Sequence, residues 1–225
     1  MTLPTRRSVL LAAGALASAL IAEPALAGPD QQDVVDHARA TIQAMRTDPS
    51  FGNAAQLLRR AKGVMIVPQL VKGGFFFGGE GGNGVLLART KNGWSYPAFY
   101  TLGGASFGLQ IGVETAEVVF LVMSERALDH WMRDEFKLGA QAGLTVLVIG
   151  SNAEADATTA ANVDVIAWAR SKGAYAGITL EGSVIKARNS YTEAYYGRPL
   201  SPREIVRGSG ANAAADGLRR SLASL

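Results

Sequence analysis

The chain has 225 residues, which is enough for one domain with a sizeable core. Its 22 basic and 19 acidic residues leave a formal net charge of +3, and this near balance argues against nucleic acid as a partner. The chain contains no cysteine, which excludes disulfides and thiolate metal sites, so packing alone must hold the fold together.

The first 27 residues have the pattern of an export signal. Arg6 and Arg7 precede an uncharged, apolar stretch over 9–22, and Ala25-Leu26-Ala27 is a small-x-small cleavage site. Paired arginines at this place are typical of bacterial twin-arginine signals. We therefore predict that residues 1–27 are a twin-arginine signal peptide. Residues 28–225 would then be a single domain in the periplasm or otherwise exported, either free or peripheral to the membrane. The alternative is a retained membrane anchor, for which the apolar stretch is short of the roughly 20 residues that a bilayer requires.

Two helices are expected next. Within 30–46, four apolar residues recur at helical spacing, namely Val34, Ala38, Ile42 and Met45. A shorter helix is expected from Asn53 to Gly63, since Asn53 is a favourable N-cap residue with Gln56 three positions on.

From residue 64 onward the pattern changes to β-strands. We predict strands over 64–67 (ended by Pro68), 73–79, 84–90, 94–101, 107–114 and 116–123, with a hairpin turn at Asn92-Gly93. The chain has 26 glycines without a fixed period, many of them in these strands. Glycine weakens a strand unless a bend or a close backbone approach requires it. We therefore expect a strongly curved sheet, or a sheet face that another element covers closely. A ligand groove floored by glycine is the alternative.

The remaining chain mixes short helices with strands. Ser124 is expected to cap a helix that ends near residue 134, and strands are expected over 144–149, 163–169 and 174–188. A capping box from Ser201 to Glu204 starts a short helix, and 211–225 has a helical pattern. The order predicts an α+β fold with a mainly antiparallel, strongly curved, Gly-rich sheet, sandwich-like or barrel-like, between N-terminal helices and short C-terminal helices.

Two motifs suggest enzyme chemistry, but their context argues against it. The run 79–84 matches G-x-G-x-x-G, yet a strand rather than a helix follows, so no helix N-terminus would meet a pyrophosphate. The run 104–108 matches G-x-S-x-G around Ser106, yet a strand again follows, and the downstream His130 has no suitable triad acid. We expect no catalytic residues and no enzymatic activity.

Metal and cofactor sites are not expected either. His37 and His130 are the two histidines, and neither has a suitable ligand three or four residues on. Glu114 and Glu181 are the acids of most interest, because each lies in a Gly-rich predicted strand. They are interpreted as structural or ligand-binding acids, with solvated strand positions as the plainer alternative.

Several sequence blocks, in order, resemble the SYLF domain family. These blocks lie within about 55–208 and include Ala61-Lys62-Gly63-Val64, Lys72-Gly73-Gly74-Phe75, Trp94-Ser95-Tyr96-Pro97, Phe107-Gly108-Leu109-Gln110, Lys172-Gly173-Ala174-Tyr175, Leu180-Glu181-Gly182-Ser183 and Tyr195-Tyr196-Gly197. Ser106 departs from the family pattern, which further weakens the hydrolase interpretation. The resemblance implies lipid binding, known in the family for phosphoinositide membranes, and no catalysis.

For this chain the resemblance implies contact with anionic phospholipid or a membrane surface through basic residues beside apolar ones. The stretch that matches the family's membrane-contacting region includes Arg59, Arg60 and Lys62, with Lys72 close behind. Phe75 and Phe76 are candidates for insertion, although a core strand is the plainer interpretation. Some family members bind actin, but export argues against actin as a partner here. The alternative function is a protein-interaction or structural module of the cell envelope without a lipid ligand.

Overall fold

The computed structural model describes residues 29–49, 53–74, 77–107, 112–138, 143–149, 162–172, 180 and 182–225. The helices in chain order are α1 (Pro29–Ala44), α2 (Ala54–Leu58), α3 (Glu125–Trp131), α5 (Asn189–Tyr196), α6 (Pro202–Glu204) and α7 (Asp216–Ala223). The strands are β1 (Gly63–Gly74), β2 (Phe77–Thr90), β3 (Gly93–Trp94), β4 (Ala98–Phe107), β5 (Gly112–Val122), β6 (Glu135–Lys137), β7 (Val146–Ile149), β8 (Val165–Lys172) and β9 (Val184–Ala187).

The strands form one strongly curled, half-barrel sheet, which confirms the predicted fold class. The strand order is β6-β9-β4-β2-β1-β5-β8-β7, with β3 paired to β2. The described pairings are antiparallel except for β7 with β8, which run parallel. Among the described pairings, β1–β2, β2–β3 and β7–β8 join strands that are consecutive in sequence, and the others join strands that are further apart along the chain.

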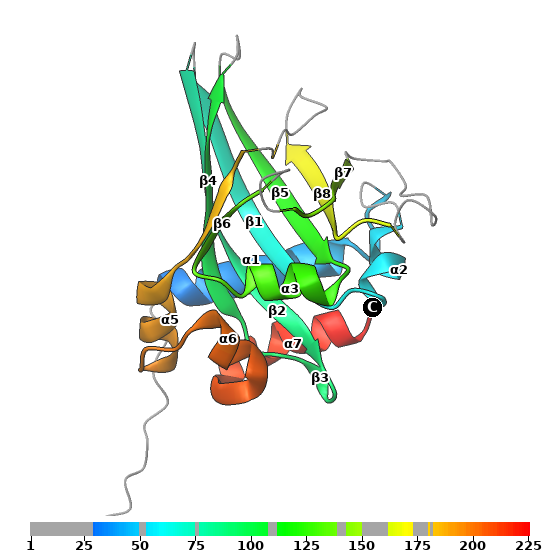
Figure 1. The fold of residues 1–225 in the computed structure, drawn as a ribbon, viewed down its shortest axis with the longest axis vertical. Coiled ribbons are helices and arrows are strands. Elements are labelled where there is room, and N and C mark those ends of the chain that lie inside the picture. The colour runs from blue at the N-terminus through cyan, green and yellow to red at the C-terminus, as the bar shows by residue number, and fades with distance from the viewer. Residues whose placement is uncertain are drawn as a thin grey trace, which may run out of the picture.

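Helices cover both faces of the sheet. Figure 1 shows α1 behind the strands and α3 in front of them, while β1, β4 and β5 extend beyond the helices at their upper ends. The α1 face carries the cluster that joins α1, α2, α5 and α7 to Val64, Ile66, Val85 and Leu87. The α3 face carries the cluster that joins α3 and Leu200, Ile205 and Val206, which flank α6, to Met65, Leu86 and Phe120. Because side chains alternate along a strand, β1, β2, β4, β5 and β8 each contribute to both clusters.

A β-bulge in β1 accounts for two of the strand glycines. The register of β1 shifts between Ile66 and Gln69 against β2, around Pro68. Proline lacks an N–H and is tolerated at a bulge, so it does not end the strand as the sequence pattern predicted. The bulge pushes backbone toward β2: a Cβ at Gly82 would lie 2.5 Å from Gln69 O, and one at Gly84 would lie 2.6 Å from Ile66 O. The expectation of close backbone approach is correct at these two positions.

Other predicted strand limits were wrong. The segment 73–79 was predicted as one strand, but β1 ends at Gly74 and β2 begins at Phe77. Similarly, 107–114 falls on the end of β4 and the start of β5. Residues 108–111, and 174–179 and 181 of the predicted strand over 174–188, lie outside the described residues. Within the described part of 174–188, the strand is β9, Val184–Ala187. The residue types of 73–79 and 107–114 do not mark where one strand ends and the next begins, so the sequence pattern alone misses these limits.

The N-terminal helices differ from their predicted form in detail. The buried face of α1 carries Val35 in place of Val34, together with Ala38 and Ile42, and the buried Met45 follows the last residue of the helix. The second helix, α2, ends at Leu58, and the Asn53 side chain makes no capping hydrogen bond. No described helix has the length and apolar character needed to cross a bilayer.

Two predicted caps are confirmed. Ser124 Oγ accepts a hydrogen bond from Ala127 N–H at 3.1 Å and begins α3. Ser201 and Glu204 form the predicted capping box, with Pro202 in the first turn of α6. The cap at Ser124 also places one wall of the site described next.

Candidate functional site

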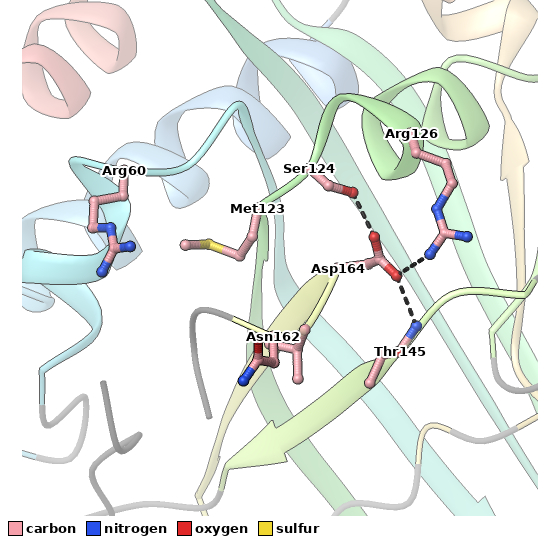
Figure 2. Close-up of a pocket in the computed structure, with 8 residues that line it drawn as sticks. Arg60, Met123, Ser124, Arg126, Thr145, Asn162 and Asp164 are labelled. Atoms are coloured by element: carbon pink, nitrogen blue, oxygen red, sulfur yellow. Dashed lines mark hydrogen bonds and ion pairs between the residues drawn. The ribbon is translucent and has the colours of Figure 1, made fainter. Parts of the chain in front are cut away.

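A pocket of about 310 Å³ lies between the end of α2 and the start of α3 (Figure 2). We call it the α2–α3 pocket. Residues from segments far apart in sequence line it: Arg60, Met123, Ser124, Arg126, Thr145, Asn162, Val163 and Asp164. The pairing of β8 with β5 on one side and with β7 on the other brings the start of β8 and the residue before β7 beside the end of β5.

Asp164 fixes one wall of this pocket. Its carboxylate accepts hydrogen bonds from Ser124 Oγ at 2.6 Å, from Arg126 Nη2 at 2.6 Å and from Thr145 N–H at 3.1 Å. Burial alone would raise the pKa of Asp164, but these three donors outweigh burial and hold its pKa below the ordinary value. Asp164 therefore stays ionised and anchors the Arg126 guanidinium at the pocket.

Arg60 lines the pocket from the α2 side. Figure 2 shows its guanidinium away from the Asp164 network, with Met123 between them. The Arg60 side chain is exposed and, within the described part of the chain, has no ion pair or hydrogen bond. Two arginines against one aspartate give the α2–α3 pocket an excess of positive charge, with one arginine anchored and one available.

A second pocket of about 310 Å³ lies on the other side of α2, against the end of α7; we call it the α2–α7 pocket. It is lined by Leu58, Arg59, Arg89, Leu222, Ala223, Ser224 and Leu225. Arg89 is anchored: its Nη2 and Nε donate to Leu58 O at 2.8 Å and Ala61 O at 3.0 Å, and its guanidinium stacks on Trp94 at 4.4 Å. Arg59 is exposed, and no described residue pairs with its side chain.

Lys62 lies next to these arginines in sequence. Its Nζ is 3.5 Å from a Glu125 carboxylate oxygen, and the two side chains are 47% and 72% exposed. An exposed pair of this kind contributes little and exchanges readily with other partners. The structure thus keeps Arg59, Arg60 and Lys62 together at one end of the sheet, as the sequence suggested, and adds Arg126 to them.

Lys72 is not part of this basic group. It lies nine positions after Gly63 along β1, which is about 30 Å of strand. Its Nζ lies 2.8 Å from Glu80 Oε2, and the two side chains are only 16% and 4% exposed. Cross-strand register places Lys72 between Glu80 on β2 and Glu114 on β5, and Glu114 Oε1 is buried. Lys72 therefore pairs with Glu80 within the sheet, and Glu114 lies at the register position on its other side.

Three residues singled out from the sequence, Phe75, Phe76 and Glu181, lie outside the described residues. Within the part of the chain that the structure describes, no group of three or more His, Asp or Glu side chains is arranged to hold a metal ion. The run 79–84 lies within strand β2, so its G-x-G-x-x-G pattern has no helix behind it.

Sequence reasoning missed Arg126, Asp164 and Arg89. The cap at Ser124 was visible, and it placed Arg126 in the first turn of a helix. Asp164 is 38 residues further on and reaches Arg126 through the β5–β8 pairing. Arg89 contacts α2 across 31 residues of sequence. These are tertiary contacts with no local signal.

Comparison with known proteins gives the chain a clear set of relatives. The family profile described as "Ysc84: Las17-binding protein actin regulator" matches residues 103–225. Protein YSC84 of Saccharomyces cerevisiae is 37% identical over 156 residues, which are 68% of this chain and 33% of that protein. SH3 domain-containing YSC84-like protein 1 of Homo sapiens is 28% identical over 165 residues, 72% of this chain and 48% of that protein. The chain thus spans about a third to a half of the length of these relatives.

Proposed function

The chain belongs to the Ysc84 (SYLF) family, and from this premise we propose that it is a non-enzymatic domain that binds anionic phospholipid. The binding surface is the basic end of the sheet, formed by Arg59, Arg60 and Lys62 with Arg126. One observation carries the proposal: the exposed Arg60 guanidinium has no described partner and lines a pocket whose other arginine is already held by Asp164.

The physical chemistry of this surface suits a phosphate-bearing membrane. Guanidinium groups match phosphate oxygens in a two-pronged geometry that lysine cannot reproduce. Each Lys or Arg near an anionic bilayer contributes about 1 kcal/mol. Four such residues give at most about 4 kcal/mol, which corresponds to millimolar affinity, because Asp164 and Glu125 offset part of the charge of Arg126 and Lys62. Charge alone therefore gives weak binding to the membrane. The fit of a lipid headgroup in the pockets at Arg59 and Arg60 would add to this affinity.

The proposed location is the bacterial periplasm or cell envelope, at the membrane surface. It rests on the twin-arginine pattern in residues 1–27. In that compartment actin would not be a partner, although the family description includes the words "actin regulator". Co-sedimentation of the chain with filamentous actin would contradict this part of the proposal.

Vesicle binding tests the proposal directly. The chain without residues 1–27 is sedimented with phosphatidylcholine vesicles and with vesicles that also contain phosphatidylglycerol. We expect binding to the anionic vesicles, and a several-fold loss in the variant Arg59→Ala/Arg60→Ala. The matched control is Lys137→Ala/Arg207→Ala, which removes two exposed positive charges from β6 and from the turn after α6. Absence of binding to either vesicle, or equal losses in both variants, would contradict the proposed site.

A second candidate function is protein binding without a lipid ligand. Its support is the names of relatives, such as LAS seventeen-binding protein 3 of Saccharomyces cerevisiae, which is 34% identical over 156 residues. The same vesicle experiment separates the two functions. Wild-type chain that ignores anionic vesicles but co-purifies from envelope extracts with one defined protein would favour this second function.

A further inference from the structure

Strand β7 (Val146–Ile149) is an outer strand of the sheet, and one of its two edges has no partner among the described residues. The strand order places β7 at one end of the sheet, where β8 is its described neighbour. In the part of the chain that the structure describes, no residue of β7 has a hydrogen bond beyond this pairing. β7 therefore presents a row of free main-chain groups, on which a further strand can pair.

The register of β7 with β8 shows which main-chain groups point to the free edge. Val146 is the parallel partner of Val165, and Val165 N–H donates to Thr145 O at 3.0 Å. In a parallel ladder this bond means that the main chain of residues 145, 147 and 149 points to β8. The N–H and C=O groups of Val146 and Val148 then point away from β8. Two donors and two acceptors thus lie on the free edge, on either side of Leu147.

The two outer strands of the sheet differ in how their edges are protected. β6 carries exposed Glu135 and Lys137, and charged side chains on an edge oppose pairing with another chain. β7 carries only valine, leucine and isoleucine, and Val148 is 39% exposed. Val71 is the other exposed large hydrophobic residue among the described ones, but it lies on β1, which is paired on both sides. The edge of β7 is therefore the one without charges to protect it.

We propose that β7 pairs antiparallel with β7 of a second copy of the chain, about a two-fold axis at Leu147. This register sets Val146 opposite Val148 of the partner subunit, and the reverse pair is equivalent by symmetry. Each hydrogen-bonded antiparallel pair exchanges two N–H···O bonds, so the two pairs use every main-chain group that points to the free edge. A strand whose outward groups are symmetric about one residue is self-complementary, as a two-fold interface requires. Because β7 has only four residues, the buried area is small and the dimer is weak.

Sedimentation equilibrium tests this pairing. The chain without residues 1–27, which keeps every described residue, is measured from about 10 μM to about 1 mM. Wild type should show a reversible equilibrium between monomer and dimer. Val148→Lys puts a charge on the edge, and Val148→Pro removes an outward N–H without breaking a bond to β8, so both variants should stay monomeric. Val71→Lys is the matched control: Val71 is 40% exposed but lies away from a sheet edge, so this variant should dimerise like the wild type.

Amide hydrogen exchange identifies the paired edge. The N–H groups of Val146 and Val148 should become protected as the concentration rises, whereas those of Leu147 and Ile149, which point to β8, should be protected at every concentration. Thermal unfolding checks that Val148→Lys is folded, as its exposed side chain leads us to expect.

Three results would overturn the proposal. Wild type that stays monomeric up to about 1 mM would leave the edge to a strand of another protein. A dimer that survives Val148→Lys, or in which Val146 and Val148 exchange freely, would use another surface. Slow exchange of both amides in the dilute monomer would mean that another part of the same chain covers the edge. Vesicle binding is independent of all three results.

Discussion

Lys72 Nζ lies 2.8 Å from Glu80 Oε2 across β1 and β2, in side chains that are 16% and 4% exposed. The Glu80 carboxylate also accepts a hydrogen bond from Ser183 Oγ, which ties the loop before β9 to β2. A Cβ at Gly104, the β4 partner of Glu80, would lie 3.0 Å from Glu80 Oε1. The ion pair thus lies beside Gly104 on β4. Through Glu80 it joins β1, β2 and the segment before β9.

Lys72→Met is expected to destabilise the protein by about 3–5 kcal/mol, because it leaves the Glu80 charge buried without its cation. The double variant Lys72→Met/Glu80→Gln should recover most of this loss, since it removes both charges and keeps an acceptor for Ser183. Urea unfolding of the two variants and the wild type measures the difference.

The control for the buried pair is Lys186→Met. Lys186 Nζ lies 3.4 Å from a Glu135 carboxylate oxygen, in side chains 68% and 53% exposed. An exposed pair contributes at most about 1 kcal/mol. If Lys72→Met lowered the free energy of unfolding no more than Lys186→Met, the interpretation of Lys72 as a structural charge would be wrong. Lys72 would then again be a candidate for lipid binding.

Adjacent glycines on β2 should respond in opposite ways to alanine. Gly82→Ala is expected to cost about 1–3 kcal/mol or more, because its Cβ would lie 2.5 Å from the Gln69 carbonyl oxygen at the bulge. Gly81→Ala should be neutral or stabilising by up to about 1 kcal/mol, since a Cβ there meets nothing within 4 Å and alanine lowers the entropy of the unfolded chain. Chemical unfolding compares the two.

The neighbouring position serves as the internal control, because both substitutions add the same methyl group to the same strand. Equal effects would show that the bulge relaxes freely and that close approach does not explain Gly82. A large loss of stability in Gly81→Ala would contradict the open space found around a Cβ at this position.

The fold could be predicted from the sequence where its signals are local. Ser124 and Ser201 are capping residues within a few positions of the groups they bind, and both caps are as expected. The bulge at Pro68 could not be foreseen, because its cause is the pairing of β1 with β2 and β5, not the sequence around the proline. For the same reason the pattern of 64–67 could not show that β1 continues to Gly74.

The candidate site was predictable only in part. Adjacent basic residues at Arg59, Arg60 and Lys62 are visible in the sequence and stay together in the structure. Lys72 has the same residue type ten positions after Lys62, but the extended strand carries it about 30 Å away to an acidic neighbour. The anchoring of Arg126 by Asp164 depends on the strand order β1-β5-β8-β7, which the sequence does not reveal.

Asp164 should make stability depend on acid pH. Hydrogen bonds hold its pKa below the ordinary aspartate value of about 4, so its contribution is fully present above that value and is lost as pH falls through the lowered, folded-state pKa. Asp164→Asn should therefore destabilise the protein at pH 7, and the gap to wild type should narrow as pH falls below about 4. Urea unfolding across pH 7 to 2 measures that gap.

Asp129→Asn is the matched control for this pH series. The Asp129 carboxylate pairs with Arg203 at 3.1 Å, in side chains that are 60% and 39% exposed, so its loss should change stability little at any pH. A gap between wild type and Asp164→Asn that stays constant down to pH 2 would contradict the role of the Asp164 charge. In that case Asp164 would contribute to stability through the shape of its side chain and not through its charge.

Vesicle binding should weaken steeply with salt. The screening length falls from about 30 Å at 0.01 M to about 3 Å at 1 M, so exposed arginines lose most of their attraction to the surface over this range. We expect the wild-type chain to lose binding to anionic vesicles as NaCl rises, and Arg59→Ala/Arg60→Ala to show a shallower dependence, because fewer charges act. Sedimentation at a series of NaCl concentrations measures both slopes, with Lys137→Ala/Arg207→Ala as the control for net charge. Binding that is insensitive to salt would mean that apolar contacts dominate, and the arginine pair would then not be the main site.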